Sequence, residues 1–280
     1  MKYLEQKVVE LDAKKYVRRH AVASDCKRHI DEPTTIVDAD GKPLMIYDVV
    51  RDGKLTKARQ ALKRLKYLKD VRGIARTGML TNARVFGYAP RDGRRRQPCR
   101  AATADQTYKD AANALIGCAK FIDDWYKEQL PDEYKTHADC IAEVDDDWRI
   151  GKTVFTSGIA NYNNTIQYHY DSGNFKDCRS IMLGFRQHAT GGFLCVPQLE
   201  TSLAIDDYSL TAFDGQSLFH GVTPIWMAPK GFRATAVYYS LRRMWRCEPI
   251  EKEIARHRKQ MTESAINPFW KRTQEKNGDD

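Results

Sequence analysis

The sequence lacks a long apolar stretch, a paired-cysteine motif and an internal repeat. No run approaches the ~18 to 20 apolar residues that a membrane-spanning helix needs, and the first residues contain no apolar signal region. We therefore expect a soluble protein of the cytoplasm. The seven cysteines are scattered, odd in number and never arranged as CxxC, so we expect no disulfide framework.

Acidic residues are scarce in one part of the chain. Residues 51–100 contain 16 Lys and Arg but only 3 Asp and Glu, a net charge of +13. The whole chain carries +9, so the remainder, with 30 basic and 34 acidic residues, carries −4. This asymmetry favours a polyanionic partner such as nucleic acid. A solvated basic helix is the plainer alternative.

Helical patterns dominate the first half of the chain, after a predicted hairpin at residues 34–50. Apolar residues at helical spacing predict a basic helix over about 54–69. They also predict a long helix over about 104–128, which Pro131 would end. Between the two helices lies an exposed turn that contains three consecutive arginines, Arg94, Arg95 and Arg96.

After about residue 140 the pattern changes to short runs rich in β-branched and aromatic residues. These predict strands at 165–170, 180–185, 192–196, 209–213, 216–219 and 233–241. A charged helix follows at about 250–262. We predict an α+β fold in which helices pack outside a double-stranded β-helix, or jelly roll. A single domain over 1–280 would comprise a helix-rich part at 1–139, the jelly-roll core at 140–245 and a helix and tail at 246–280.

The residues most typical of a metal site are His169 and Asp171. On a strand, positions i and i+2 point to the same face, so this pair can bind one metal ion. A second histidine would complete the two-histidine, one-carboxylate set of non-haem iron(II) oxygenases. His188 and His220 are both candidates. We favour His220, because it follows a predicted strand flanked by small residues, whereas His188 lies in a polar turn.

Arg233, thirteen residues after His220, strengthens this interpretation. The arginine opens a predicted strand, and its guanidinium can bind a carboxylate through two parallel hydrogen bonds. A His-x-Asp motif alone arises often by chance. The order His-x-Asp, distal His and then Arg, all on β-like runs, is much more specific.

This pattern resembles the iron(II)/2-oxoglutarate dioxygenases, and within them the compact bacteriophage members of the TET/JBP group of nucleic-acid base oxygenases. Over residues 140–241 the resemblance rests on three stretches: His169–Asn174, which reads HxDxxN as in that group, Gly191–Leu194, and His220–Arg233. The resemblance implies that His169, Asp171 and His220 are the catalytic iron(II) ligands. It also implies that Arg233 binds 2-oxoglutarate and that Asn174 contacts a flipped pyrimidine.

The resemblance further implies oxidation of the methyl group of 5-methylcytosine in DNA to hydroxymethyl, with O2 as co-substrate and further oxidation left open. A methyl group inside a duplex cannot reach such a centre, so the base must be flipped out. The basic helix and Arg94, Arg95 and Arg96 would bind phosphates. Thymine in DNA, RNA and protein remain alternative substrates. A non-catalytic binding module is disfavoured by the complete ligand set.

Overall fold

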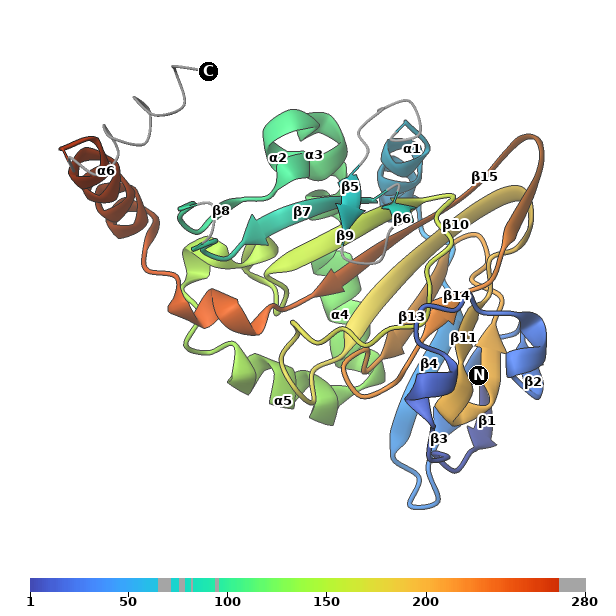
Figure 1. Cartoon of the computed structure of the whole chain (residues 1–280). Helices are drawn as coiled ribbons and strands as arrows, with labels where there is room; N and C mark the ends of the chain where they lie inside the picture. The colour runs from blue at the N-terminus through green and yellow to red at the C-terminus, as the bar shows by residue number, and fades with distance from the viewer. Residues whose placement is uncertain (65–71, 76–78, 82, 94–95, 267–280) are drawn as a thin grey trace.

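The computed structural model describes residues 1–64, 72–75, 79–81, 83–93 and 96–266, and a nine-stranded sheet is its central feature (Figure 1). In spatial order its strands are β1 (Lys2–Glu5), β3 (Thr34–Val37), β4 (Pro43–Val49), β13 (Ser209–Phe213), β10 (Ser180–Gly191), β15 (Ile225–Tyr239), β9 (Ser157–Tyr162), β7 (Ala83–Ala89) and β8 (Arg100–Ala101). Apart from the parallel pair β1 and β3, neighbouring strands run antiparallel.

A smaller, four-stranded sheet packs against the large one. Its strands are, in order, β14 (Gly221–Val222), β11 (Leu194–Val196), β12 (Thr201–Leu203) and β2 (Arg28–Ile30). Met182 and Phe213 of the large sheet share a buried apolar cluster with Leu194, Leu203 and Val222 of the small sheet. A separate pair is formed by β5 (Arg72–Ala75) and β6 (Met79–Thr81).

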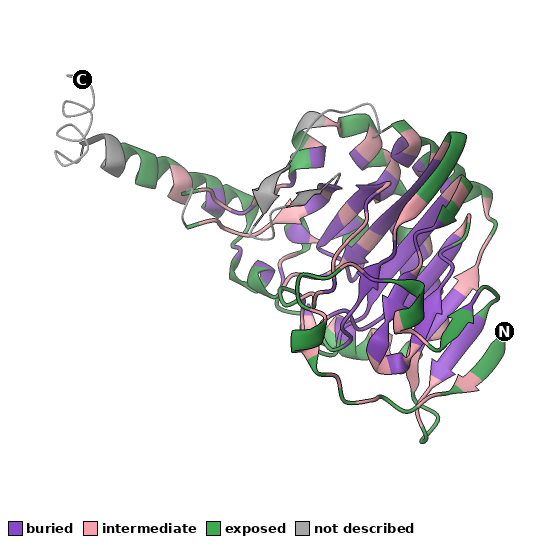
Figure 2. Ribbon diagram, turned by 45° about the vertical axis from the view of Figure 1, so that its right-hand side comes forward, coloured by how far each residue is buried: buried purple, intermediate pink, exposed green. Residues whose placement is uncertain are grey.

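Helices pack on the other face of the large sheet. They are α1 (Thr56–Arg64), α2 (Thr103–Thr107), α3 (Lys109–Gly117), α4 (Ala119–Gln129) and α5 (Pro131–Cys140). Leu62, Leu115 and Ile122 of these helices are buried in the largest apolar cluster, together with strand residues. The last helix, α6 (Ile250–Ile266), extends away from the sheets and is mostly exposed (Figure 2). Within the described residues, no helix combines the length and apolar character needed to cross a membrane.

Side-chain alternation along β15 separates two environments. The even-numbered residues from 232 to 238 belong to the helix-side core. The odd-numbered residues from 233 to 239 line a cavity of about 280 Å³ on the opposite face. Leu194 of β11 and Val222 of β14 line the same cavity, which therefore lies between the two sheets. Alternation is the normal geometry of a strand, and here it gives β15 one apolar face and one functional face.

The expected sheet-rich core with packed helices is confirmed, as are the hairpin of β3 and β4 and the C-terminal helix α6. The prediction of a helix-rich first half is wrong, because residues 1–139 contribute five strands to the large sheet and β2 to the small one. Several of these strands are only two to four residues long, too short to show a period in the sequence. The basic helix is present as α1, and residues 65–69 of the prediction lie outside the described residues.

The single long helix predicted over 104–128 is wrong. The segment forms α2, α3 and α4, with a break at Tyr108, whose φ of −130° and ψ of 51° are not helical. A second break follows Gly117, which disfavours a helix interior. Pro131 does not merely end a helix but starts α5, since its missing N–H costs nothing in a first turn. The apolar spacing in the sequence therefore reflects packing against the sheet, and the three shorter helices keep that packing.

Strands predicted at 165–170 and 216–219 are also wrong, and β9 was not anticipated. Both predicted segments are loops, and an isolated bridge joins His169 to His220, the residue directly after the second segment. Their aromatic residues mark packing rather than a strand, because the rings of Tyr168 and Phe219 stack 5.5 Å apart.

One disulfide corrects the expectation for the cysteines. Cys99 and Cys247, which are 148 residues apart in the sequence, are bonded, and their Cα atoms lie 5.8 Å apart. Spacing in the sequence gives no signal for partners that only the fold brings together. This bond ties the segment before β8 to the segment before α6.

Substitution of Gly158 tests the close contact between β7 and β9. A Cβ atom there would lie 2.1 Å from the ring of Phe86, which is fully buried. We expect Gly158→Ala to lower the free energy of unfolding by about 1–3 kcal/mol, measured by urea denaturation. Gly117→Ala is the control, because a Cβ there meets nothing within 4 Å. Equal stability of the two variants would contradict this account of the sheet.

Candidate metal centre

Two loops carry the predicted metal ligands. His169 and Asp171 lie between β9 and β10, and His220 directly precedes β14. The backbone N–H of His169 donates to the carbonyl of His220 (2.9 Å), and that of His220 donates back (3.1 Å). The N–H of Asp171 donates to the carbonyl of Gly215 (2.8 Å). Three backbone hydrogen bonds thus hold the loops together without a continuous strand.

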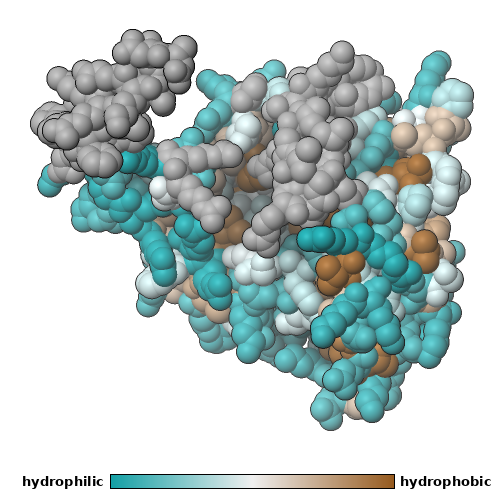
Figure 3. Space-filling view, viewed as in Figure 1, coloured by the Kyte–Doolittle hydropathy of each residue, from teal (hydrophilic) through white to brown (hydrophobic). Residues whose placement is uncertain are grey.

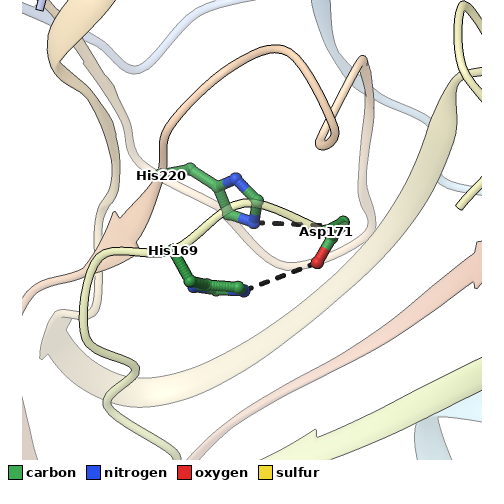
Figure 4. Close-up of side chains that lie close together, drawn as sticks. All are labelled: His169, Asp171 and His220. Atoms are coloured by element: carbon green, nitrogen blue, oxygen red, sulfur yellow. Dashed lines mark ion pairs between the residues drawn. The ribbon is translucent and has the colours of Figure 1, made fainter. Parts of the chain in front are cut away.

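The three side chains converge on one point (Figure 4). Their ligand atoms all lie within 4.8 Å of one another. Nε2 of His169 is 3.5 Å from Oδ1 of Asp171, and Nε2 of His220 is 3.9 Å from Oδ2. His169 and Asp171 keep 39% and 27% of their side-chain surface, against 7% for His220, so solvent reaches the cluster from their side.

Hydrogen bonds on the far side of each imidazole orient the two rings. Nδ1 of His169 lies 2.9 Å from the carbonyl of Gln167, and Nδ1 of His220 lies 2.8 Å from the carbonyl of Leu218. A carbonyl only accepts, so each Nδ1 must carry the proton. In the neutral form of each ring, Nε2 is then the unprotonated nitrogen and faces Asp171, the arrangement found in metal-ligating histidines.

The charges of the cluster suit a cation. Burial alone would raise the pKa of the Asp171 carboxyl, but the hydrogen bond from His169 and the nearby imidazoles lower it below its usual value. Burial opposes protonation of His169 too, yet Asp171 outweighs it, and the pKa of His169 is raised. Burial and the His169 charge lower the pKa of His220 to about 4. An ionised carboxylate and a neutral His220 are the forms that bind metal.

Glycine makes room beside the cluster. A Cβ atom on Gly215 would lie 2.4 Å from Oδ2 of Asp171, so any side chain there would displace the carboxylate. The loop over Asp214–Ser217 is itself stabilised by Asp214, whose Oδ1 accepts from the backbone of Gln216 (3.0 Å). The position of Asp171 therefore depends on this tight turn.

Arg233 lies in the same cavity and is 2% exposed. Its Nε and Nη2 have no hydrogen-bond partner among the described residues. Burial and the charge of neighbouring Arg186 lower the pKa of the Arg233 guanidinium to about 9, so it is still protonated at neutral pH. A Cβ on Gly192 would lie 2.8 Å from Nε, and this glycine leaves the guanidinium open on that side.

The other predicted residues lie in different places. His188 is exposed at a register shift of β10, where its φ is 47°, and is not part of the cluster. Asn174 lines the cavity and donates from Nδ2 to Oγ of Ser180 (3.1 Å). Arg96 is exposed in a turn, whereas Arg94 and Arg95 lie outside the described residues.

Sequence reasoning missed part of the cavity wall. Thr235 follows Arg233 by two positions on β15, and Asn161 lies opposite it on β9. Alternation from Arg233 could have indicated Thr235. Asn161 could not be found, because β9 itself was not predicted.

Comparisons with known proteins place the fold. Residues 86–242 match the model Tet_JBP, the oxygenase domain of the 2OGFeDO superfamily. The structure of NgTET1 in complex with 5mC DNA is similar, with a TM-score of 0.60 and 14% identity over 82% of this chain and 86% of that one. OsALKBH1 (TM-score 0.38, 11% identity, 71% and 97% covered) and a viral collagen prolyl hydroxylase from Paramecium Bursaria Chlorella virus-1 (0.37, 12%, 69% and 87%) are less similar. A search of curated proteins found no match.

The choice of His220 can be tested by metal binding alone. We expect His220→Ala to weaken the affinity for iron(II) by more than about 100-fold, since even partners outside the ligand set contribute about 10–100-fold. His188→Asn is the matched control, because asparagine tolerates a positive φ. Anaerobic titration measures both. A loss in the His188 variant, with His220→Ala unaffected, would reverse the assignment.

Proposed function

Because the chain belongs to the Tet_JBP family, the oxygenase domain of the 2OGFeDO superfamily, we propose that it oxidises the methyl group of 5-methylcytosine in DNA to hydroxymethyl. The family model covers more than half of the chain, residues 86–242. The substrate proposal is supported by the similar structure, which was solved with 5mC DNA. The required partners would be iron(II), 2-oxoglutarate and O2.

The donor set fits iron(II). Two imidazole nitrogens and one carboxylate are the protein ligands of the non-haem iron oxygenases, and they leave positions free for other ligands. His169, Asp171 and His220 would hold the ion, and the Gln167 and Leu218 carbonyls would keep each Nε2 directed toward it. Gly215 would keep the Asp171 carboxylate in place.

The single observation that carries the proposal is the guanidinium of Arg233. A buried cation without a partner costs several kcal/mol, which a carboxylate can offset. Two unpaired guanidinium nitrogens in the cavity of the metal cluster fit the far carboxylate of 2-oxoglutarate. Since Arg233 and the three candidate metal ligands line the same cavity, it would suit a molecule that has two anionic groups.

Bound together, iron(II) and 2-oxoglutarate would supply the O2-dependent oxidation that breaks a methyl C–H bond. The residues of the chain would position the reactants and exclude water from them. Ile159, Leu194 and Val222 form apolar parts of the cavity wall and limit access of water to the reacting groups.

Asn174 would read the base. A base must leave the duplex to reach a cavity between two sheets. The Asn174 side chain gives one amide hydrogen to Ser180, which leaves a second hydrogen and the carbonyl oxygen for a pyrimidine edge. Its own backbone carbonyl accepts from Nε2 of Gln216 (2.8 Å), which fixes the loop. An amide can serve cytosine or thymine, so thymine remains the second candidate.

Nucleoside mass spectrometry tests the reaction directly. The chain is incubated with iron(II), 2-oxoglutarate, ascorbate and methylated duplex DNA, and the DNA is then digested. We expect 5-hydroxymethylcytosine from the wild type and none from His220→Ala. Oxidised thymidine in its place would transfer the activity to thymine. If both nucleosides stay unmodified while RNA or protein is oxidised, the DNA assignment is wrong.

The substitution Arg233→Met removes the charge of the side chain but keeps an unbranched, flexible chain in its place. Without 2-oxoglutarate, we expect this variant to gain about 1–4 kcal/mol in the free energy of unfolding, because an unpaired buried charge is removed. Saturating 2-oxoglutarate with iron(II) should stabilise the wild type by about 3 kcal/mol at 100 times Kd, and the variant hardly at all.

Arg179→Met is the matched control, and thermal denaturation with and without 2-oxoglutarate measures the stability of the wild type and both variants. Arg179 is also buried, but its Nη2 donates to the Pro43 carbonyl (3.0 Å) and lies 3.7 Å from Glu133. This control should lose stability and keep the response to 2-oxoglutarate. An undiminished response in Arg233→Met would exclude Arg233 as the carboxylate ligand.

A further inference from the structure

The short helix η8 (Arg242–Arg246) begins at the rim of the cavity. Leu241, directly before it, lines the cavity and forms an isolated bridge with Asn174. The N–H of Arg242 donates to the carbonyl of Gly173 (3.0 Å), and Gly173 also lines the cavity. The loop of the metal cluster and η8 are therefore joined by backbone contacts.

The helix η8 itself carries exposed cationic side chains. Arg242, Arg243 and Arg246 are all exposed. Within the described part of the chain, none of these three guanidinium groups forms an ion pair with a carboxylate, and Nη2 of Arg243 donates to the carbonyl of Arg91 (3.2 Å). The Arg246 guanidinium lies 5.3 Å from the ring centroid of Trp245, which is 49% exposed, and this contact orients it. In Figure 3 the surface near the start of α6 is mainly hydrophilic.

The helix η8 is also held rigidly. Met244, between the arginines, is fully buried in the main core. Cys247 directly follows η8 and is bonded to Cys99, three residues after Arg96. The disulfide thus ties η8 to the segment directly after the basic turn predicted from the sequence. Arg91, at the start of that turn, pairs with Glu253 and with Glu248 (2.8 Å) beyond η8.

We propose that Arg242, Arg243 and Arg246 bind the phosphates next to the base that enters the cavity. This inference rests on the proposed function. A strand that delivers a base to the three candidate metal ligands must pass the rim, and its phosphates are the anions that a row of exposed arginines without carboxylate partners fits. Buried Met244 and the disulfide fix the backbone that carries these arginines, which lowers the entropy lost on binding.

The test is the salt dependence of binding, measured by fluorescence anisotropy on a methylated duplex. The full chain is used with iron(II) and 2-oxoglutarate under anaerobic conditions, so that no turnover occurs. Loss of three phosphate contacts should reduce the slope of log K against log salt by about 2 to 3. We expect this from the variant Arg242→Ala, Arg243→Ala, Arg246→Ala, with at least ~10-fold weaker binding at low salt.

Two matched variants complete the design. Replacing the same arginines by lysine keeps the charge and should keep most of the slope, even if the alanine variant folds poorly. Lys2→Ala, Arg28→Ala, Lys42→Ala removes three exposed charges from the β1–β4 end of the structure (Figure 1) and should change the slope little. Thermal denaturation checks that each variant is folded.

The outcomes separate the inference from the proposed function. If the wild type oxidises 5-methylcytosine in DNA but the alanine variant keeps the wild-type slope, the η8 assignment is overturned and the function stands. If the wild type neither binds nor oxidises DNA, both are overturned. A slope that falls equally in the control variant also overturns the inference, because the effect then follows net charge rather than η8.

Discussion

The register of β15 is the constraint on which the rest of the structure depends. One face of the strand carries Ala234 and Ala236, small enough for the helix-side core to approach closely, and the other carries Arg233. A slip of one residue would exchange these faces and put a charge into the apolar core. Pairing on both sides prevents the slip, since Arg233 lies opposite Arg186 of β10 and Ala234 lies opposite Tyr162 of β9.

The three candidate metal ligands are positioned differently from the residues of the neighbouring strand. His169, Asp171 and His220 lie on loops, where the period of a strand does not fix direction. Reciprocal backbone hydrogen bonds and the Nδ1 contacts to carbonyl oxygens two residues earlier fix it instead. Rigid sheets therefore supply the walls of the cavity, and hydrogen-bonded loops supply its reactive edge, which is where binding residues are usually found.

The sequence indicated the side chains of the site better than the backbone that carries them. His169, Asp171, His220 and Arg233 could be named because their chemistry is specific and their order is restrictive. The strand expected at 165–170 was not found, since aromatic residues that pack around a loop look like those of a strand. The bond between Cys99 and Cys247 could not be anticipated, because it depends on the folded positions of distant segments.

The charge of Arg233 connects the fold to its ligand. Its pKa of about 9 means that the guanidinium stays protonated at pH 7 despite burial. Arg186 cannot neutralise it and is itself committed to carbonyl oxygens of Ala189, Ala204 and Gly191. The protein alone thus leaves a buried positive charge without a carboxylate partner, at a place where attraction to an anion is stronger than in water. Burial of this arginine costs free energy that a bound anion would offset, so the cavity favours anionic ligands.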